Sequence, residues 1–219
     1  MRDLLLIALV MSAVACGGSP TSPSVPSNPA MPNASGPIHD TLNATGSAAT
    51  ADGVWSERSG GDDRQVYDDF VSPTAATIRI VAWQGIRPTA HAPTRFYLSF
   101  IADNGGFPLR QVDETNSGRP KALSSSTFSI DQVNERLGVT RACDNSPQEQ
   151  CGSYDYSVIL IPPFGGTAGT RYWLLIQAES PLNSRSGWSW RKGHTDNGFS
   201  TSNIAGSTFP WDLAFALRP

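Results

Sequence analysis

Two tryptophans in the stretch SGWSWRKG are the side chains best suited to hold a ligand. Trp188 and Trp190 are two residues apart, so in a β-strand they would point to the same face. Aromatic rings stack on the apolar face of a sugar, and the basic residues Arg191, Lys192 and His194 could hydrogen-bond its hydroxyls. A sandwich strand also has one inward face, where large aromatic residues normally lie. We therefore expect the pair to belong to the core, with a carbohydrate platform as the alternative.

Two adjacent aspartates in the stretch VYDDFV pose a second question of chemistry. Neighbours in a strand point to opposite faces, so either Asp68 or Asp69 must face the interior. A buried carboxylate must be paired, hydrogen-bonded or bound to a metal. Asp212 could join them around a structural calcium ion if the first and last strands are adjacent, although the sequence has no D-x-D-x-D-G loop. We expect the inward aspartate to accept backbone hydrogen bonds, with calcium as the alternative and no other cofactor.

The sequence offers no catalytic set. A glycosidase needs two carboxylates that face each other across a cleft, and the spacing of the acidic residues pairs none of them. The acidic residues in or beside the predicted strands are Glu57, Asp68, Asp69, Asp103, Glu179 and Asp212. The three histidines have no zinc-site spacing, and Ser189 lacks the second glycine of a nucleophile elbow. We expect a non-catalytic protein and keep a hydrolase as the least favoured alternative.

The N-terminal residues resemble a bacterial lipoprotein signal. An arginine precedes an apolar run that is too short for a membrane span, since about 20 apolar residues are needed. The stretch SAVAC resembles a lipobox, which predicts a signal peptide over residues 1–15 and a lipid on Cys16. An ordinary secretory signal cut near Ala15 is the alternative. By resemblance to enteric lipoproteins, Gly17 after the cysteine suggests the outer membrane or the cell surface.

Residues 16–53 predict a disordered stalk. They are rich in Gly, Ser, Thr, Pro, Asn and Ala, a composition that cannot bury enough apolar surface to offset ordering. Five prolines recur at every third residue, the period of polyproline II, which predicts an extended spacer or a proline-rich ligand for a partner. Net charge is −3 and no basic run is present, so nothing indicates a nucleic-acid partner.

The two remaining cysteines predict a disulfide. Cys143 and Cys151 are separated by a polar, turn-like segment, and no histidine lies near either of them in the sequence. An exported chain with one leftover pair of cysteines is typically cross-linked.

Residues 54–219 predict a single all-β domain. Short apolar or alternating runs recur between clusters of Gly, Pro, Asn and Asp, as in TIRIVAWQG, RFYLSFIAD, YDYSVILIP, TRYWLLIQA and WDLAFALRP. The number and spacing of these runs predict a jelly-roll-like β-sandwich with about nine or ten strands. The segment FSIDQVNERLG is compatible with one helical turn or with a loop that leads into a strand.

The order of these motifs resembles a family of uncharacterised bacterial exported domains. Members show a DDF strand, an F-x-A-D-x-G-G turn, a Y-W-L strand, a W-x-W strand and a closing D-L-A-F strand, and the resemblance covers nearly all of residues 60–217. It implies export and a β-sandwich, and by analogy a role in binding or display. We expect a surface domain that binds an extracellular ligand such as carbohydrate, or alternatively an adhesive protein that engages another protein.

Overall fold

The computed structural model describes most of the predicted domain and one short segment of the predicted stalk. The described residues are 36–42, 53–59, 62–110, 120–143, 146–180, 187–194, 198–203 and 207–219. The predicted signal peptide, Cys16 and the proline repeat lie outside these ranges. Within them, no helix is long and apolar enough to span a membrane.

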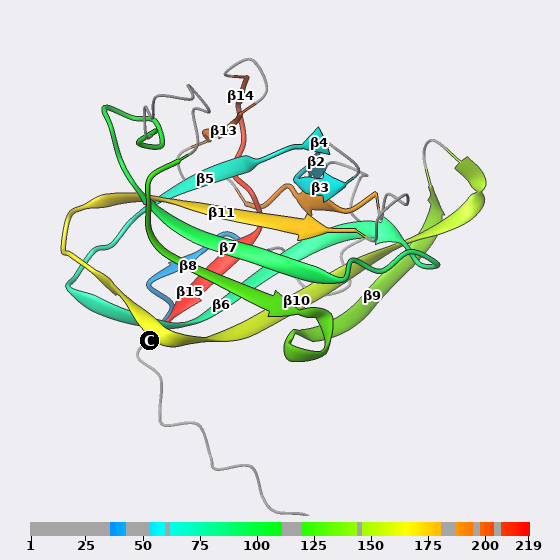
Figure 1. Cartoon of the computed structure of the whole chain (residues 1–219), viewed down its shortest axis with the longest axis horizontal. Helices are drawn as coiled ribbons and strands as arrows, with labels where there is room; N and C mark the ends of the chain where they lie inside the picture. The colour runs from blue at the N-terminus through cyan, green and yellow to red at the C-terminus, as the bar shows by residue number, and fades with distance from the viewer. Residues whose placement is uncertain are drawn as a thin grey trace, which may run out of the picture. The chain divides into compact units, whose positions relative to one another are not determined.

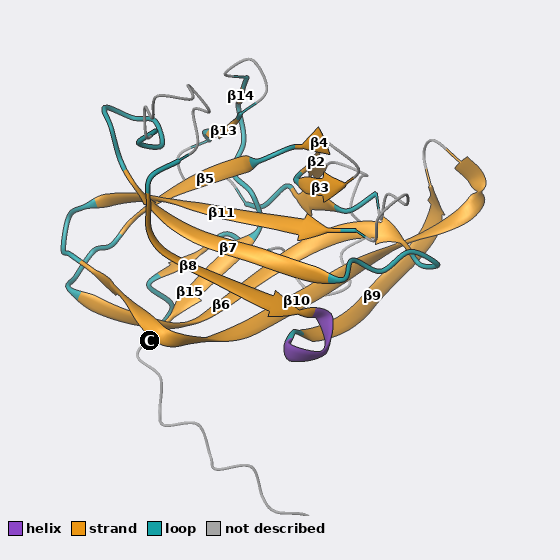
Figure 2. Cartoon of the chain, in the orientation of Figure 1, coloured by secondary structure: helices purple, strands orange, loops and turns teal. Residues whose placement is uncertain are grey.

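The described chain is built almost entirely from strands (Figures 1 and 2). The strands are β1 (His39–Asp40), β2 (Gly53–Trp55), β3 (Glu57–Ser59), β4 (Asp62–Asp63), β5 (Val66–Val71), β6 (Ala76–Pro88), β7 (Arg95–Ala102), β8 (Ala122–Ser129), β9 (Asn134–Cys143), β10 (Ser146–Gly166), β11 (Arg171–Glu179), β12 (Ser189–Arg191), β13 (Ser200–Ser202), β14 (Thr208–Phe209) and β15 (Phe215–Arg218). They outnumber the predicted nine or ten because segments of two or three residues complete the edges of the sheets.

The strands form two sheets that pack together, which confirms the predicted all-β sandwich. The seven-stranded sheet has the order β1-β15-β6-β10-β9, with β12 and β2 continuing from β6. The eight-stranded sheet has the order β14-β13-β5-β11-β3-β4, with β7 and β8 on the other side of β11. Among the described strands, all pairs are antiparallel except β11 with β3. Figure 1 shows β11, β7 and β8 side by side, and the long β9–β10 ribbon at the right of the molecule.

Alternation of residue type decides which face of each strand enters the core. In β7, Phe96, Leu98 and Phe100 are buried in the main cluster between the sheets. In β6, Trp83 stacks on Tyr156 of β10 with ring centroids 5.4 Å apart, so the two central strands of the seven-stranded sheet meet through aromatic rings. Side chains at the alternate positions point to the outer faces of the sandwich.

The segment FSIDQVNERLG forms both structures that its sequence allows. Ser129 precedes a single 3₁₀ turn over Ile130–Gln132, and the Gln132 side chain accepts a hydrogen bond from the Ser129 amide at 3.0 Å. The chain then continues directly into β9. In Figure 2 this turn is the purple segment between β8 and β9.

The predicted boundary of the stalk at residue 53 is wrong, because part of the predicted stalk is a strand of the sandwich. Strand β1 pairs with β15, and His39 stacks on Phe215 at 4.3 Å. Thr41 is buried, and its hydroxyl donates to the carbonyl of Leu213 at 2.6 Å. By its internal contacts the sandwich unit begins at Ala34. Composition alone missed this strand because only a few of its residues contact the core.

We expect a fragment that starts at residue 54 to be less stable than one that starts at Ala34. The shorter fragment loses the β1–β15 pairing and the Thr41 hydrogen bonds, each worth about 1 kcal/mol, so the loss should be about 3 kcal/mol. Urea denaturation of the two fragments measures this difference. Thr41→Val in the longer fragment should reproduce about a third of it, whereas equal stability of the two fragments would show that β1 does not stabilise the sandwich.

Candidate functional site

Trp188 and Trp190 lie in the core, on the inner face that their alternation predicts. Both side chains have no exposed surface. Trp188 packs edge-on against Phe96 at 5.3 Å, and Trp190 packs edge-on against Phe215 at 5.9 Å. Gly85 makes room for Trp188, since an added Cβ there would come within 2.3 Å of the indole nitrogen. Neither ring offers a face to a sugar, so the alternative of a carbohydrate platform at this pair is wrong.

The three basic residues after this pair do not gather around the two indoles. The Arg191 side chain is buried on the opposite face of the sheet, where it donates to Ser153 Oγ at 3.3 Å. Lys192 lies over the ring of Trp211 at 5.0 Å. His194 is exposed, and its backbone amide donates to the carbonyl of Thr41. We expected these residues in one site because they are adjacent in the chain, but their side chains point to different faces.

Asp68 is the inward aspartate, and it accepts backbone hydrogen bonds. Its Oδ1 accepts from the amide of Asp69 at 3.0 Å, and its Oδ2 accepts from the amide of Leu213 at 2.6 Å. Burial raises the pKa of the Asp68 carboxyl well above its ordinary value, and the nearby charges of Asp212 and Asp69 raise this pKa further. The carboxylate therefore joins β5 to the segment that leads into β15.

Asp69 and Asp212 have separate roles in the same region. Asp212 accepts from the amides of Gly198 and Phe199 at 3.1 and 3.0 Å, so it caps a loop. Asp69 faces outward and pairs with Arg171, with 3.3 Å between Oδ2 and Nε. In the described ranges, no group of three or more His, Cys, Asp or Glu side chains is arranged to hold a metal ion. The three aspartates act here as hydrogen-bond acceptors and an ion-pair partner.

The outer face of the eight-stranded sheet carries a further set of polar and aromatic side chains. Because Phe96, Leu98 and Phe100 of β7 enter the core, the alternate residues Tyr97 and Ser99 point outward. The strand register aligns these residues with their outward neighbours on β11 and β8. The rows across the sheet are Glu179–Arg95–Ser129, Gln177–Tyr97–Thr127 and Leu175–Ser99–Ser125.

One part of this face is open to solvent and polar, and we call it the open strip. Its residues are Arg95, Tyr97, Ser99, Ser125, Thr127 and Glu179. Glu179 accepts from the Tyr97 hydroxyl at 2.6 Å and pairs with Arg95 Nε at 3.0 Å. Burial and the hydrogen bond to Glu179 raise the pKa of Tyr97, so its hydroxyl stays protonated at neutral pH and donates to the carboxylate. The hydroxyls of Ser99 and Ser125 lie 2.8 Å apart on the same strip.

Three aromatic rings pack edge-on in a row on the same outer face, and we call this row the aromatic end. Trp173 is fully buried at its base, and its indole donates to Asp103 Oδ1 at 2.8 Å. Phe199 packs edge-on against Trp173 at 5.9 Å, and Phe107 packs edge-on against Phe199 at 6.1 Å. Phe107 is 52% exposed, so its ring has a surface that a ligand could cover. Trp173 belongs to a second buried cluster, separate from the main core between the sheets.

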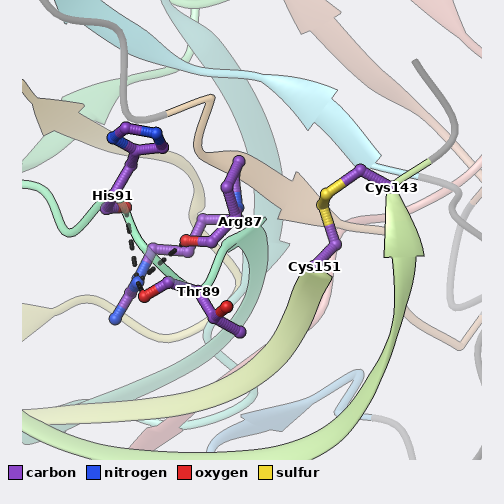
Figure 3. The surroundings of a disulfide bond; sticks show 6 residues. Arg87, Thr89, His91, Cys143 and Cys151 are labelled. Carbon is purple, nitrogen blue, oxygen red and sulfur yellow. Dashed lines mark hydrogen bonds between the residues drawn. A yellow bond between two sulfur atoms is a disulfide. The ribbon is translucent and has the colours of Figure 1, made fainter. Parts of the chain in front are cut away.

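Two further polar clusters lie away from the outer face of the eight-stranded sheet. Inside one end of the sandwich, Arg87 donates to the carbonyls of Thr89 and His91, binds Glu135 at 2.9 Å and covers the ring of Tyr154 at 4.0 Å. Figure 3 shows the Arg87 guanidinium directed toward this turn. These contacts use the guanidinium to close the end of the sandwich, so we assign the cluster a structural role.

The second cluster lies on the outer face of the seven-stranded sheet. Asp155 accepts from Gln84 at 2.9 Å and from Arg136 at 2.8 Å. Gln84 is buried, and Arg136 is 64% exposed at its side chain. This cluster lies on the other sheet from the open strip, so it provides a site for control substitutions.

The predicted disulfide is present beside the Arg87 turn (Figure 3). The bond joins Cys143, the last residue of β9, to Cys151 in the first part of β10, across a sequence separation of 8 residues. The same ribbon holds the turn, because the Thr89 amide donates to the carbonyl of Gln150 at 2.7 Å. The bond therefore pins a local ribbon rather than joining the two sheets.

We expect the double variant Cys143→Ser/Cys151→Ser to unfold with a free energy about 2–3 kcal/mol lower than that of the wild type. This value is the loop-closure entropy expected for a loop of this length. Chemical denaturation measures it, and the far-ultraviolet circular dichroism of the folded variant should remain that of a β-sandwich. Reduction of the wild type should lower stability to the same extent, whereas an unchanged midpoint would contradict a stabilising role.

We compared the chain with family models, curated proteins and solved structures. No family model, no curated protein and no solved structure matches it. The resemblance to a family of exported domains therefore stays a prediction, and the function has to be argued from the side chains.

Proposed function

We propose that this protein is a non-catalytic domain, exported and held by a lipid on Cys16, that binds extracellular carbohydrate on the outer face of its eight-stranded sheet. The observation that carries the proposal is the combination on one face of the half-exposed ring of Phe107 and the hydrogen-bonded group Tyr97–Glu179–Arg95. A sugar presents an apolar ring face and a rim of hydroxyls, and such a surface can satisfy both.

The length of the face suits a chain of sugars rather than a single one. Glu179 and Trp173 lie six residues apart on β11, which at about 3.3 Å per residue separates the two ends by roughly 20 Å. Between Glu179 and Trp173, the surface carries the short side chains of Ser99 and Ser125. Short side chains leave room for an extended ligand to lie along the strands.

A glycan array with the fragment that starts at Ala34 tests the proposal. We expect binding to one class of oligosaccharide, weakened at least tenfold by Tyr97→Ala and by Phe107→Ala, a loss of about 1.4 kcal/mol or more. Arg136→Ala is the matched control, since it removes an exposed side chain from the other sheet. Absence of glycan binding, or equal weakening by the control, would overturn the proposal.

The adhesive alternative is favoured by a different observation. Pairing between β9 and β10 ends at Ser157, and beyond it Ile159 and Ile161 are 65% and 85% exposed on β10. Exposed aliphatic side chains on a strand edge are typical of a protein contact. Pro162 and Pro163 follow directly and lack amide hydrogens, which limits strand addition at this edge. A protein partner whose binding is lost on Ile161→Lys would support this alternative.

Anchoring through Cys16 gives a separate prediction. We expect Cys16→Ser to move the protein from the membrane fraction to the soluble fraction, because the serine cannot receive the lipid that a lipobox cysteine carries. Cell fractionation and the intact mass of the mature protein check this. A wild type without an acyl mass, together with a variant that stays in the membrane fraction, would contradict it.

A further inference from the structure

We infer that the open strip selects neutral glycans and holds them through a pair of adjacent hydroxyls at Glu179 and Arg95. This inference rests on the proposed function and names its ligand class. It starts from the atoms that the ion pair leaves available.

The ion pair and the tyrosine engage one oxygen of the carboxylate. The Tyr97 hydroxyl and Arg95 Nε both contact Glu179 Oε2. Within the described ranges, Glu179 Oε1 and the two terminal nitrogens of Arg95 have no hydrogen-bond partner. The side chains of Arg95 and Glu179 are 50% and 28% exposed, so a ligand can reach these atoms. A free acceptor therefore lies beside free donors, and the Glu179–Arg95 pair itself carries no net charge.

Adjacent sugar hydroxyls match this arrangement. Each hydroxyl can donate one hydrogen bond and accept others, so one can donate to Glu179 Oε1 while its neighbour accepts from an Arg95 terminal nitrogen. Hydrogen bonds to charged groups are about twice as strong as neutral ones, and here the ligand does not have to break the ion pair to form them. Tyr97 is a positioning residue: its hydroxyl fixes the orientation of the carboxylate, and Arg58 lies over its ring at 6.0 Å.

The charged side chains of this face balance, so they give an acidic glycan no net attraction. The acidic side chains are Asp63, Asp69, Asp103 and Glu179, and the basic ones are Arg58, Arg95, Arg110 and Arg171. Asp69 is paired with Arg171, and Asp103 and Asp63 accept from Trp173 and Gln177. A uronate or sulfate at the free nitrogens of Arg95 would lie beside the Glu179 carboxylate, which has no proton to donate to it. A neutral sugar can donate to Glu179 Oε1 and accept from Arg95 at the same time.

The test compares wild type and Glu179→Gln with two sets of probes. The neutral probes are oligomers of glucose, mannose and galactose, and the acidic probes are oligogalacturonate and a sulfated oligosaccharide. We expect the wild type to bind a neutral probe at least tenfold more tightly than either acidic probe. Glu179→Gln leaves Arg95 without its carboxylate, so it should lose tenfold or more for the neutral probe and gain for the acidic ones. Equal melting temperatures of the two proteins establish that the variant is folded.

The possible failures of the inference and of the proposed function are distinct. Preference of the wild type for an acidic probe, with weakening by Tyr97→Ala, would overturn the inference and leave carbohydrate binding at this face intact. A neutral probe that binds wild type and Glu179→Gln equally would also overturn it. Binding of neither probe set would overturn the proposed function as well.

Discussion

Replacement of Trp188 or Trp190 by alanine should lower the free energy of unfolding by about 3–5 kcal/mol. Both indoles are fully buried, so each substitution removes a large apolar surface from the core and leaves a cavity among rings that are held by other strands. Trp190→Ala also leaves the carbonyl of Ala214 without the indole donor that lies 3.1 Å away. For a domain of this size, the loss corresponds to a fall in melting temperature on the order of 10 °C.

Thermal and urea denaturation of the fragment that starts at Ala34 measure this effect. Phe107→Ala is the matched aromatic control, because half of its ring is exposed, and it should cost less than about 1 kcal/mol. If both tryptophan variants had the same melting temperature as the wild type, the indoles would be exposed. A carbohydrate site at Trp188 and Trp190 would then be the better hypothesis.

Asp68 should make the stability of the protein fall as pH rises. Its pKa is raised in the folded state above the ordinary value of 3.8, by burial first and then by the charges of Asp212 and Asp69. Below pH 3.8 the group is protonated in both the folded and the unfolded state. As pH rises further, the unfolded state loses this proton first, so the free energy of unfolding decreases until the folded-state pKa is reached.

Asp68→Asn removes this titration and isolates its contribution. We expect the stability of the wild type relative to Asp68→Asn to decline from about pH 4 upward in urea denaturation. A constant difference across pH would contradict a raised pKa. Below about pH 4, where Asp68 is protonated in both states, Asp68→Ala should be less stable than the wild type by about 2–5 kcal/mol, because it leaves the amides of Asp69 and Leu213 without an acceptor in the core.

Most of the fold could be predicted from local patterns. Alternation in RFYLSFIAD identifies Phe96, Leu98 and Phe100 as the inner face, and the structure places all three in the core. The two remaining cysteines were enough to predict the disulfide. Strand β1 could not be found in this way, because its position depends on pairing with β15, more than 170 residues away. Composition describes a segment but not its distant partner.

The candidate site could be predicted less well than the fold. The outward position of Tyr97 follows from the same alternation that placed Phe96 inside, so that part of the signal was present in the sequence. Its grouping with Glu179 requires the β7–β11 register, which no local pattern supplies. Trp188 and Trp190 drew attention because they are close in sequence, whereas the side chains of the open strip come from three strands.

The most direct test of carbohydrate binding on the outer face of the eight-stranded sheet is to locate a bound sugar on the domain. Backbone amide resonances of the fragment that starts at Ala34 can be followed in a nuclear magnetic resonance titration with the tightest neutral oligosaccharide from the array. We expect shifts confined to β7, β8, the outward positions of β11 and the segment around Phe107, with β9 and β10 unchanged. Shifts centred on the seven-stranded sheet or on the Arg87 turn, or no shift at all, would contradict carbohydrate binding on this face.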